Sequence, residues 1–371
     1  MIKRQRISRR MFLGGGLGIA GLASNVLALS AGGPQVHASS HISNTSMSNM
    51  AGMAGMAAGA VPTLPFLKNN VNPALNGGFD PSKFIQQFEK GNVQRINGKQ
   101  TRVFNLVSAN RTITVAIDDA TGRPVQFQAW AFGTSATTLQ VPGPTLRCNQ
   151  GETVLINYTN NSPFTHSIHF HGIHNTGNDG SLVAAAPGQS VKYEFVADPP
   201  GLMAYHCHVF PGLSHVGYGL YGAMIIDPPD GRKPMAELVL VMNGFATDKT
   251  NPTKNTVYAF NTIANHYGRN QIAVPLDTPI RVYLLNMCLD RPISFHLHAN
   301  FFDVYPYGTK DNSTMFTDMV TTSFLERYLL EFTFDTKHFT PGSYMFHSHD
   351  DPGEMGMFGM FLLTNGVATA A

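Results

Sequence analysis

Four short histidine pairs stand out in this sequence of 371 residues, each consisting of a histidine, one other residue and a second histidine. The pairs are His169 and His171, His206 and His208, His296 and His298, and His347 and His349. In an extended strand, side chains two residues apart point to the same face and lie about 7 Å apart, so each pair directs two imidazoles to one place. Imidazole is a ligand of zinc, copper, iron and nickel, so eight converging imidazoles predict a metal cluster.

Cys207 lies inside the second pair and must therefore point to the opposite side of its strand. One strand can then hold a thiolate-bound metal on one face and an imidazole-bound cluster on the other. A blue-copper site needs one thiolate and two imidazoles with a weak axial ligand, and His166, Cys207 and His215 supply that set. Five residues after His215, Leu220 occupies the position where an axial methionine often sits, and a leucine that does not bind copper would raise the reduction potential.

The sequence contains an internal repeat. The segment 200–208 is echoed by 341–349 at a separation of 141 residues, and 167–171 is echoed by 294–298 at a separation of 127. This repeat predicts two homologous β domains that meet near residues 227–231. The second copy has Ile293 where the first has His166, and Ser348 where the first has Cys207. It therefore retains the cluster ligands and lacks the thiolate site.

The composition favours an all-β protein. Hydrophobic residues make up 43% of the chain and charged residues only 13%, while 36 glycines and 23 prolines supply turns. The formal net charge is +2, but Lys3, Arg4, Arg6, Arg9 and Arg10 lie together at the N-terminus, and without these five cations it is −3. A net charge this close to zero gives no indication that the protein binds nucleic acid or an anionic membrane.

Two N-terminal segments stand apart from the rest of the chain. Ser8 to Leu13, followed by a glycine-rich apolar run to about Leu29, resembles a twin-arginine export signal, with a Sec signal peptide or a membrane anchor as alternatives. We therefore expect a periplasmic or extracellular protein. No later stretch reaches about 18 uninterrupted apolar residues, so we expect no membrane span in the mature chain.

The following residues, 31–65, have no apolar periodicity and are interpreted as a disordered linker. Within it Met47, Met50, Met53 and Met56 recur every third residue. Thioethers bind Cu(I), so Cu(I) capture is one hypothesis, but a low-complexity tether is the simpler interpretation.

From residue 101 onward the pattern is typical of short strands separated by turns. We expect strands at 102–106, 111–117, 125–129 and 153–158, and one short helix at 84–88 that is capped by Asp80. Three cysteines argue against a disulfide framework. A bond between Cys148 and Cys288 stays open, although buried apolar cysteines are the simpler interpretation. Trp130 and Tyr205 are expected to be packing aromatics.

The four histidine pairs with an embedded cysteine resemble those of two-domain multicopper oxidases, which are small laccase-like enzymes with the blue copper in the first domain. The resemblance covers about residues 101–365. It implies two cupredoxin-like Greek-key β-sandwiches and four coppers per chain, one of type 1, one of type 2 and two of type 3. The implied organisation is an export signal at 1–30, a Met-rich linker at 31–65, an N-terminal extension at 66–100, and cupredoxin domains at 101–230 and 231–371.

The resemblance also implies roles for the ligands. His166, Cys207 and His215 resemble the type 1 ligands, and His169 and His296 resemble those of type 2. The type 3 ligands are then the six remaining histidines of the pairs, namely His171, His206, His208, His298, His347 and His349.

The chain is also similar to two-domain copper nitrite reductases, in the segment 141–145 and in the run from His215 to Ala223. That family has a catalytic aspartate at the position of His169 and lacks the histidines that correspond to His208 and His349. These departures favour reduction of O2 to water, with nitrite reduction as the alternative.

The implied activity couples one-electron oxidation of phenolic, aromatic amine or metal-ion donors to four-electron reduction of O2. Asp179 and Glu354 are candidate proton donors, or else turn and surface carboxylates. His174 is interpreted as an ordinary polar histidine or as a hydrogen-bond partner of a ligand. Two-domain relatives complete the cluster between subunits, so a head-to-tail homotrimer is expected. A periplasmic cuprous oxidase or a non-catalytic copper-binding protein stays open as a further alternative.

Overall fold

The computed structural model describes residues 65–248, 250–251, 254–310 and 312–365. These residues all belong to one compact unit. The expected export signal and nearly all of the Met-rich linker, including its four regularly spaced methionines, lie outside the described residues.

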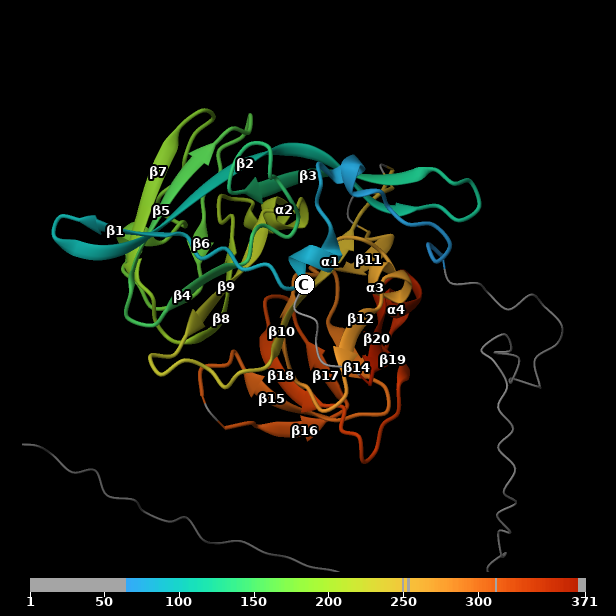
Figure 1. The fold of residues 1–371 in the computed structure, drawn as a ribbon. Coiled ribbons are helices and arrows are strands. Elements are labelled where there is room, and N and C mark those ends of the chain that lie inside the picture. Colours follow the sequence, from blue (N-terminus) through green and yellow to red (C-terminus); the bar gives the residue numbers. More distant parts are fainter. Residues whose placement is uncertain (1–64, 249, 252–253, 311, 366–371) are drawn as a thin grey trace, which may run out of the picture. The chain divides into compact units, whose positions relative to one another are not determined.

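Two β-sheets come from residues 92–227 (Figure 1). The first sheet has the order β1-β2-β5-β7, with β3 paired to β2, and the second has the order β4-β9-β8-β6. The strands of the first sheet are β1 Asn92–Ile96, β2 Lys99–Ile117, β3 Pro124–Gly133, β5 Thr153–Asn160 and β7 Ser190–Val196. Those of the second are β4 Leu146–Asn149, β6 His169–Phe170, β8 Gly201–His206 and β9 Tyr221–Asp227.

Residues 236–364 repeat this arrangement with two further sheets, ordered β11-β10-β13-β18-β15-β16 and β12-β20-β19-β14-β17. The strands are β10 Ala236–Phe245, β11 Val257–Phe260, β12 Ile272–Pro275, β13 Pro279–Asn286, β14 Ile293–Leu297, β15 Phe302–Pro306, β16 Met315–Thr317, β17 Met319–Thr322, β18 Arg327–Thr333, β19 Gly342–Ser348 and β20 Phe358–Thr364. The parallel pairs β10-β13 and β12-β20 correspond to β2-β5 and β4-β9. The internal repeat is therefore present in the strand pairing, and the all-β prediction is confirmed.

One long strand replaces two expected ones. The sequence predicts separate strands at 102–106 and 111–117, but β2 runs without interruption from Lys99 to Ile117. Its first half pairs in parallel with β5 and its second half pairs antiparallel with β3. Ser108, which lies in the gap between the two predicted strands, is buried, and its hydroxyl oxygen lies 2.6 Å from that of Tyr158. This satisfied hydroxyl allows the strand to continue.

The helices are short. Asp80 caps α1, Pro81–Phe84, by accepting a hydrogen bond from the N–H of Ser82 at 3.0 Å. The expected cap is thus present, but the helix begins and ends earlier than predicted because Pro81 is suited to the first helical position. The other helical turns are η1 Pro73–Asn76, η2 Thr176–Asn178, α2 Gly212–Gly217, α3 His266–Arg269 and α4 Asp351–Glu354.

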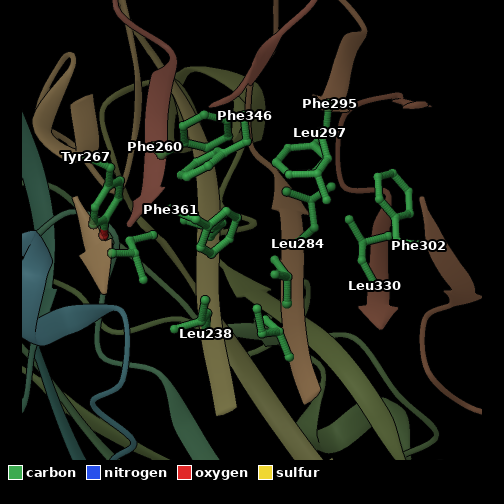
Figure 2. Packing of buried hydrophobic residues seen from close by; sticks show 14 of the residues in the cluster. Leu238, Phe260, Tyr267, Leu284, Phe295, Leu297, Phe302, Leu330, Phe346 and Phe361 are labelled. Atoms are coloured by element: carbon green, nitrogen blue, oxygen red, sulfur yellow. The ribbon is translucent and has the colours of Figure 1, made fainter. Parts of the chain in front are cut away.

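Three large buried clusters of apolar side chains hold the sheets together. The first lies within the N-terminal sandwich and includes Cys207 and Leu220. The second lies within the C-terminal sandwich, where Figure 2 shows the rings of Phe260, Phe346 and Phe361 among the packed side chains. The third contains residues of both sandwiches, so the two share a hydrophobic contact.

Residues 65–89, which we call the strap, bind both sandwiches. The side chain of Asn76 exchanges two hydrogen bonds with the backbone of Thr114 in β2, at 2.7 and 2.9 Å. On the other side, the hydroxyl of Tyr267 in α3 donates to the carbonyl oxygen of Pro81 at 2.9 Å. The strap therefore joins the first sandwich to the second.

Cys148 and Cys288 are both buried and free, and they belong to different hydrophobic clusters. The disulfide that the sequence left open is therefore not formed. In the part of the chain that the structure describes, no helix has both the length and the apolarity needed to cross a bilayer.

Candidate metal centre

Three elements bring one cysteine and two histidines together. Cys207 follows directly after β8, His166 forms a β-bridge with Ala185, and His215 lies in α2. The Sγ of Cys207 lies 3.3 Å from Nδ1 of His215 and 3.8 Å from Nδ1 of His166. The two Nδ1 atoms are 3.1 Å apart. The three predicted residues thus direct one donor atom each to a common point.

Hydrogen bonding and burial determine the protonation of these donors. Nε2 of His166 lies 3.0 Å from the Ser162 hydroxyl oxygen, so Nε2 can carry the ring proton and Nδ1 keeps a free lone pair. Burial raises the pKa of the Cys207 thiol and lowers the pKa of His166 to about 4. A metal ion between these atoms would bind the thiolate and both lone pairs. One sulfur and two imidazole nitrogens fit copper.

Leu220 is fully buried next to this site. Its carbonyl oxygen accepts a hydrogen bond from the N–H of Cys207 at 3.0 Å, and both residues belong to the same hydrophobic cluster. The N–H of Ser167 points to the Cys207 sulfur at 3.4 Å. Apolar surroundings and a hydrogen bond to sulfur are features that tune the potential of a blue-copper site.

The first two histidine pairs meet where β6 and β8 run side by side. Their register places His169 opposite His206. The Nε2 atoms of His171 and His206 are 3.1 Å apart, and the ring centroids of His169 and His208 are 5.3 Å apart. The donor atoms of His169, His171 and His206 lie within 4.8 Å of one another.

The second sandwich repeats this geometry. Strands β14 and β19 pair in a register that places His296 opposite His347. The Nε2 atoms of His298 and His347 are 3.0 Å apart, and the rings of His296 and His349 are 5.0 Å apart. Two nitrogens that bind one metal at about 2.0–2.1 Å lie about 3–3.5 Å from each other. Both sets therefore have the spacing that a shared metal requires.

Hydrogen bonds fix the ring orientation in both sets. Nδ1 of His206 donates to the carbonyl oxygen of Cys207 at 3.0 Å, and Nδ1 of His347 donates to that of Ser348 at 2.7 Å. A carbonyl oxygen only accepts, so these Nδ1 atoms carry the proton and the Nε2 atoms are free to bind metal. His206 and His347 thus present Nε2, whereas His166 presents Nδ1.

Carboxylate and carbonyl groups orient two further histidines of the pairs. Asp179 accepts a hydrogen bond from Nδ1 of His169 at 2.7 Å. Burial alone would raise the pKa of Asp179, but hydrogen bonds from Ser181 and His169 outweigh this effect and lower it. At the corresponding place in the second sandwich, Nδ1 of His296 donates to the backbone carbonyl of Asp318 at 2.9 Å. This partner could not be predicted from the sequence, because every residue has a backbone carbonyl and no residue type marks the one that accepts the bond.

The remaining candidates have different surroundings. Glu354 is exposed in α4, beside a cavity that His347 and His349 also line. His174 lies 2.7 Å, through Nε2, from the carbonyl oxygen of Phe170, and its ring is 6.1 Å from that of His169. It thus lies beside the ligands as a hydrogen-bonded polar residue.

Of the two expected packing aromatics, Tyr205 is fully buried and donates its hydroxyl to the carbonyl oxygen of Pro144 at 2.7 Å. Trp130 is only half-buried, and its ring lies 5.0 Å from that of His166 and 4.9 Å from that of His215. Sequence reasoning missed this contact because Trp130 is far from both histidines along the chain.

Each sandwich holds its own group of four histidines. Within the described residues, every ring contact between histidines of the four pairs stays inside one group, either the set from 169 to 208 or the set from 296 to 349. A single chain therefore presents two separate half-sites with the same internal geometry.

Comparisons with known proteins point to one family. Family models described as "Multicopper oxidase" match residues 133–231 and 236–366. A solved structure described as a multicopper oxidase is 33% identical with a TM-score of 0.71, and the match covers 80% of this chain and 100% of that chain.

Curated relatives match over shorter stretches. The copper-containing nitrite reductase of Neisseria gonorrhoeae is 29% identical over 216 residues, which is 53% of each chain. The L-ascorbate oxidase of Cucurbita pepo var. melopepo is 37% identical over 125 residues, which cover 29% of this chain and 22% of the relative. The chain thus spans about half the length, or less, of these curated relatives. Its two cupredoxin-like sandwiches, each matched by a family model and each carrying donors that suit copper, place the chain in the multicopper oxidase family of copper-dependent oxidoreductases.

Proposed function

We propose that the protein couples one-electron oxidation of a phenolic, aromatic amine or metal-ion donor to the four-electron reduction of O2 to water. The observation that carries this proposal is the position of Cys207. Its sulfur meets His166 and His215, while the histidine before it, His206, meets His171 with Nε2 atoms 3.1 Å apart. One short segment therefore connects a thiolate site to an imidazole site.

Four coppers per chain would use all of these donors. His166, Cys207 and His215 would hold the type 1 copper, with Leu220 in the axial place and without a bond to it. His169 and His296 would hold the type 2 copper, and the other six histidines of the pairs would hold the type 3 pair. Copper at these donors supplies one-electron redox steps by alternating between Cu(I) and Cu(II).

The protein groups have distinct tasks in this proposal. The backbone of Cys207 joins the thiolate to His206 both covalently and through the 3.0 Å hydrogen bond from Nδ1. Asp179 holds the ring of His169 through its 2.7 Å hydrogen bond and stands where protons reach the cluster. Glu354 lies on the solvent side of the second half-site and is the second candidate for proton delivery.

A complete cluster needs both half-sites, and we propose that they meet between subunits. The first sandwich of one chain would face the second sandwich of the next, and three chains would close a head-to-tail homotrimer. The identical register of His169 with His206 and of His296 with His347 supports this, because two matched halves can face each other across an interface.

Nitrite reduction is the second candidate, because a nitrite reductase is 29% identical to this chain over 216 residues. A single copper would leave several of the eight imidazoles without a role. In particular His208 and His349 lie 5.3 and 5.0 Å from the rings of His169 and His296. This surplus of ligands favours O2 reduction. A cuprous oxidase that protects the periplasm is the same reaction with Cu(I) as the donor.

We further propose that the chain is exported by the twin-arginine route, and that its organisation is a leader at 1–30, a linker at 31–65, an extension at 66–100 and domains at 101–230 and 231–371. The strand-free segment between β9 and β10, from 228 to 235, fits the proposed boundary.

The decisive experiment measures copper per chain together with O2 uptake and nitric oxide release, using phenolic donors and Cu(I), with nitrite as a competing acceptor. We expect about four coppers and O2 consumption that nitrite does not inhibit. A content near two coppers with nitric oxide release would instead establish the nitrite reductase.

A further inference from the structure

Trp130 is the only tryptophan in the chain and lies at the centre of an aromatic cluster. Its backbone N–H in β3 donates to the carbonyl oxygen of Tyr218 at 2.8 Å. The indole ring contacts Phe164 at 4.9 Å, His166 at 5.0 Å, His215 at 4.9 Å and Tyr218 at 4.6 Å, measured between ring centroids. It therefore contacts both histidines of the proposed type 1 site.

These contacts form an ordered path from solvent to ligand. Tyr218 is stacked on Trp130 with an angle of 24° between the rings, and His215 meets the indole edge-on at 85°. Tyr218 is 38% exposed and Phe164 is 47% exposed, whereas His215 is 7% exposed. The indole thus lies between two rings that reach the surface and two imidazoles that do not.

Close packing of this kind restricts the orientation of the histidine rings as well as shielding them from solvent. An edge-on aromatic contact has a preferred direction, and groups that orient a ligand imidazole determine how its lone pair meets the metal. His166 is held from the other side by the Ser162 hydroxyl at 3.0 Å. Among the described side chains, the hydrogen bonds and ion pairs of His215 reach only His166 and Cys207, and Trp130 is the aromatic ring outside this set that contacts it.

We propose that Trp130 is a positioning residue of the type 1 site, and that the Tyr218–Trp130 stack is the route by which an electron from a surface donor reaches His215. The inference rests on the proposed function, because it needs a copper that accepts the electron. In this step the donor loses one electron, which a Cu(II) ion held by Cys207, His166 and His215 would accept. No bond in Trp130 forms or breaks, and the proton lost by a phenolic donor passes to water.

The surface end of the path also favours one kind of donor. Phe164 and Tyr218 expose aromatic faces, on which a planar aromatic molecule can stack. A compact hydrated anion gains no stacking contact there. We therefore expect Tyr218 to affect planar donors more than inorganic ones.

The test compares Trp130→Leu, Trp130→Phe and Tyr218→Leu with wild type in the full copper-loaded protein. Phe339→Leu is the matched control, since Phe339 is a half-buried ring in the second sandwich, 5.0 Å from Phe334. For each protein one measures copper content, the blue absorption band and its paramagnetic resonance spectrum, the reduction potential, and the rate of anaerobic bleaching by a planar phenol and by hexacyanoferrate(II).

We expect Trp130→Leu to change the spectra and the potential and to slow bleaching by both donors, and we expect Trp130→Phe to restore part of each. Tyr218→Leu should keep the spectra and slow bleaching by the phenol about fivefold to tenfold, the equivalent of one lost ring contact, with a smaller effect on hexacyanoferrate(II). The control should match wild type.

Spectra, potential and rates that match wild type in both Trp130 variants would overturn the inference. Loss of the copper in Trp130→Leu together with wild-type values in Trp130→Phe would overturn the electron route. A wild-type protein without a blue band or O2 uptake would refute the proposed function itself, so the two failures are distinguishable.

Discussion

His206 donates a hydrogen bond from Nδ1 to the carbonyl oxygen of Cys207 across 3.0 Å. The second sandwich has the same bond, from His347 to Ser348 at 2.7 Å, although a serine replaces the cysteine there. The bond is therefore a property of the cluster ligands and does not depend on the thiolate. We therefore expect the ring of His206 to keep this hydrogen bond when Cys207 is replaced.

This independence predicts the effect of Cys207→Ser. The variant should lose one copper per chain and the blue colour, while the cluster keeps its ligands and its copper. Turnover with organic donors should fall to background because the donor-side copper is gone. Copper analysis and paramagnetic resonance provide the measurement, and loss of all copper on this one substitution would contradict the separation of the two sites.

Asp179→Asn should weaken the first half-site. The substitution removes the charge that accepts the Nδ1–H of His169 at 2.7 Å, and the loss of such a partner costs about 10–100-fold in metal affinity or activity. Asp335→Asn is the matched control, because Asp335 accepts the same kind of bond from exposed His338 at 2.9 Å, outside the four pairs. Copper retention during dialysis against a chelator distinguishes the two variants, and equal retention would argue against a supporting role for Asp179.

Mixing two inactive variants tests the proposed shared cluster. His171→Ala damages only the first half-site and His298→Ala only the second. Co-refolded with copper, they should recover part of the O2 uptake, because some interfaces then combine an intact first half with an intact second half. A cluster built within one chain would give no recovery at any mixing ratio, and each variant refolded alone serves as the baseline.

Glu152 makes the free energy of unfolding depend on pH. Hydrogen bonds from Arg102, the shorter at 2.5 Å, lower its pKa from 4.5 to about 2. A lowered carboxyl pKa contributes stability above pH 4.5 that is lost as the pH falls from there towards 2. Glu152→Gln should therefore cost about 1–2 kcal/mol at pH 7, after allowance for solvent screening, and progressively less in acid.

Denaturant unfolding of the metal-free protein across this pH range measures the Glu152 effect. Glu194→Gln, at an exposed position in β7, is the control that should change little at any pH. A Glu152→Gln penalty that stays constant down to pH 3 would contradict the assignment.

Phe346 packs in the core of the second sandwich, next to His347 in the chain. It is fully buried, its ring lies 5.3 Å from that of Phe260, and it precedes His347 in β19 (Figure 2). Phe346→Ala should cost about 3–5 kcal/mol of unfolding free energy, whereas Leu362→Ala, at a 38% exposed position, should cost less than about 1 kcal/mol. A thermal or denaturant unfolding series checks the difference, and similar losses in both would show that the cavity at Phe346 collapses.

The sequence was most informative where spacing fixes geometry. A histidine two residues from another shares its face of an extended segment, so the convergence of two imidazoles in each pair follows from the pattern alone. The register that places His169 opposite His206, and His296 opposite His347, comes only from the structure. Strand ends were harder to place, because the gap at 107–110 between the predicted strands gives no sign that the hydroxyl of Tyr158 lies beside Ser108 and lets β2 continue. Trp130 shows the same limit, since its contact with His215 joins residues far apart in the chain.

The strap holds the two sandwiches of one chain at a fixed angle to each other. Asn76 ties it to β2 in the first sandwich and Pro81 accepts a bond from Tyr267 in the second, so rotation of one sandwich against the other would break hydrogen bonds on both sides. In a ring of head-to-tail subunits, the number of copies that closes the circle depends on the angle between the two contact faces of each copy. If the protein forms such a ring, the rigid connection between the two sandwiches of each subunit would determine how many subunits close it.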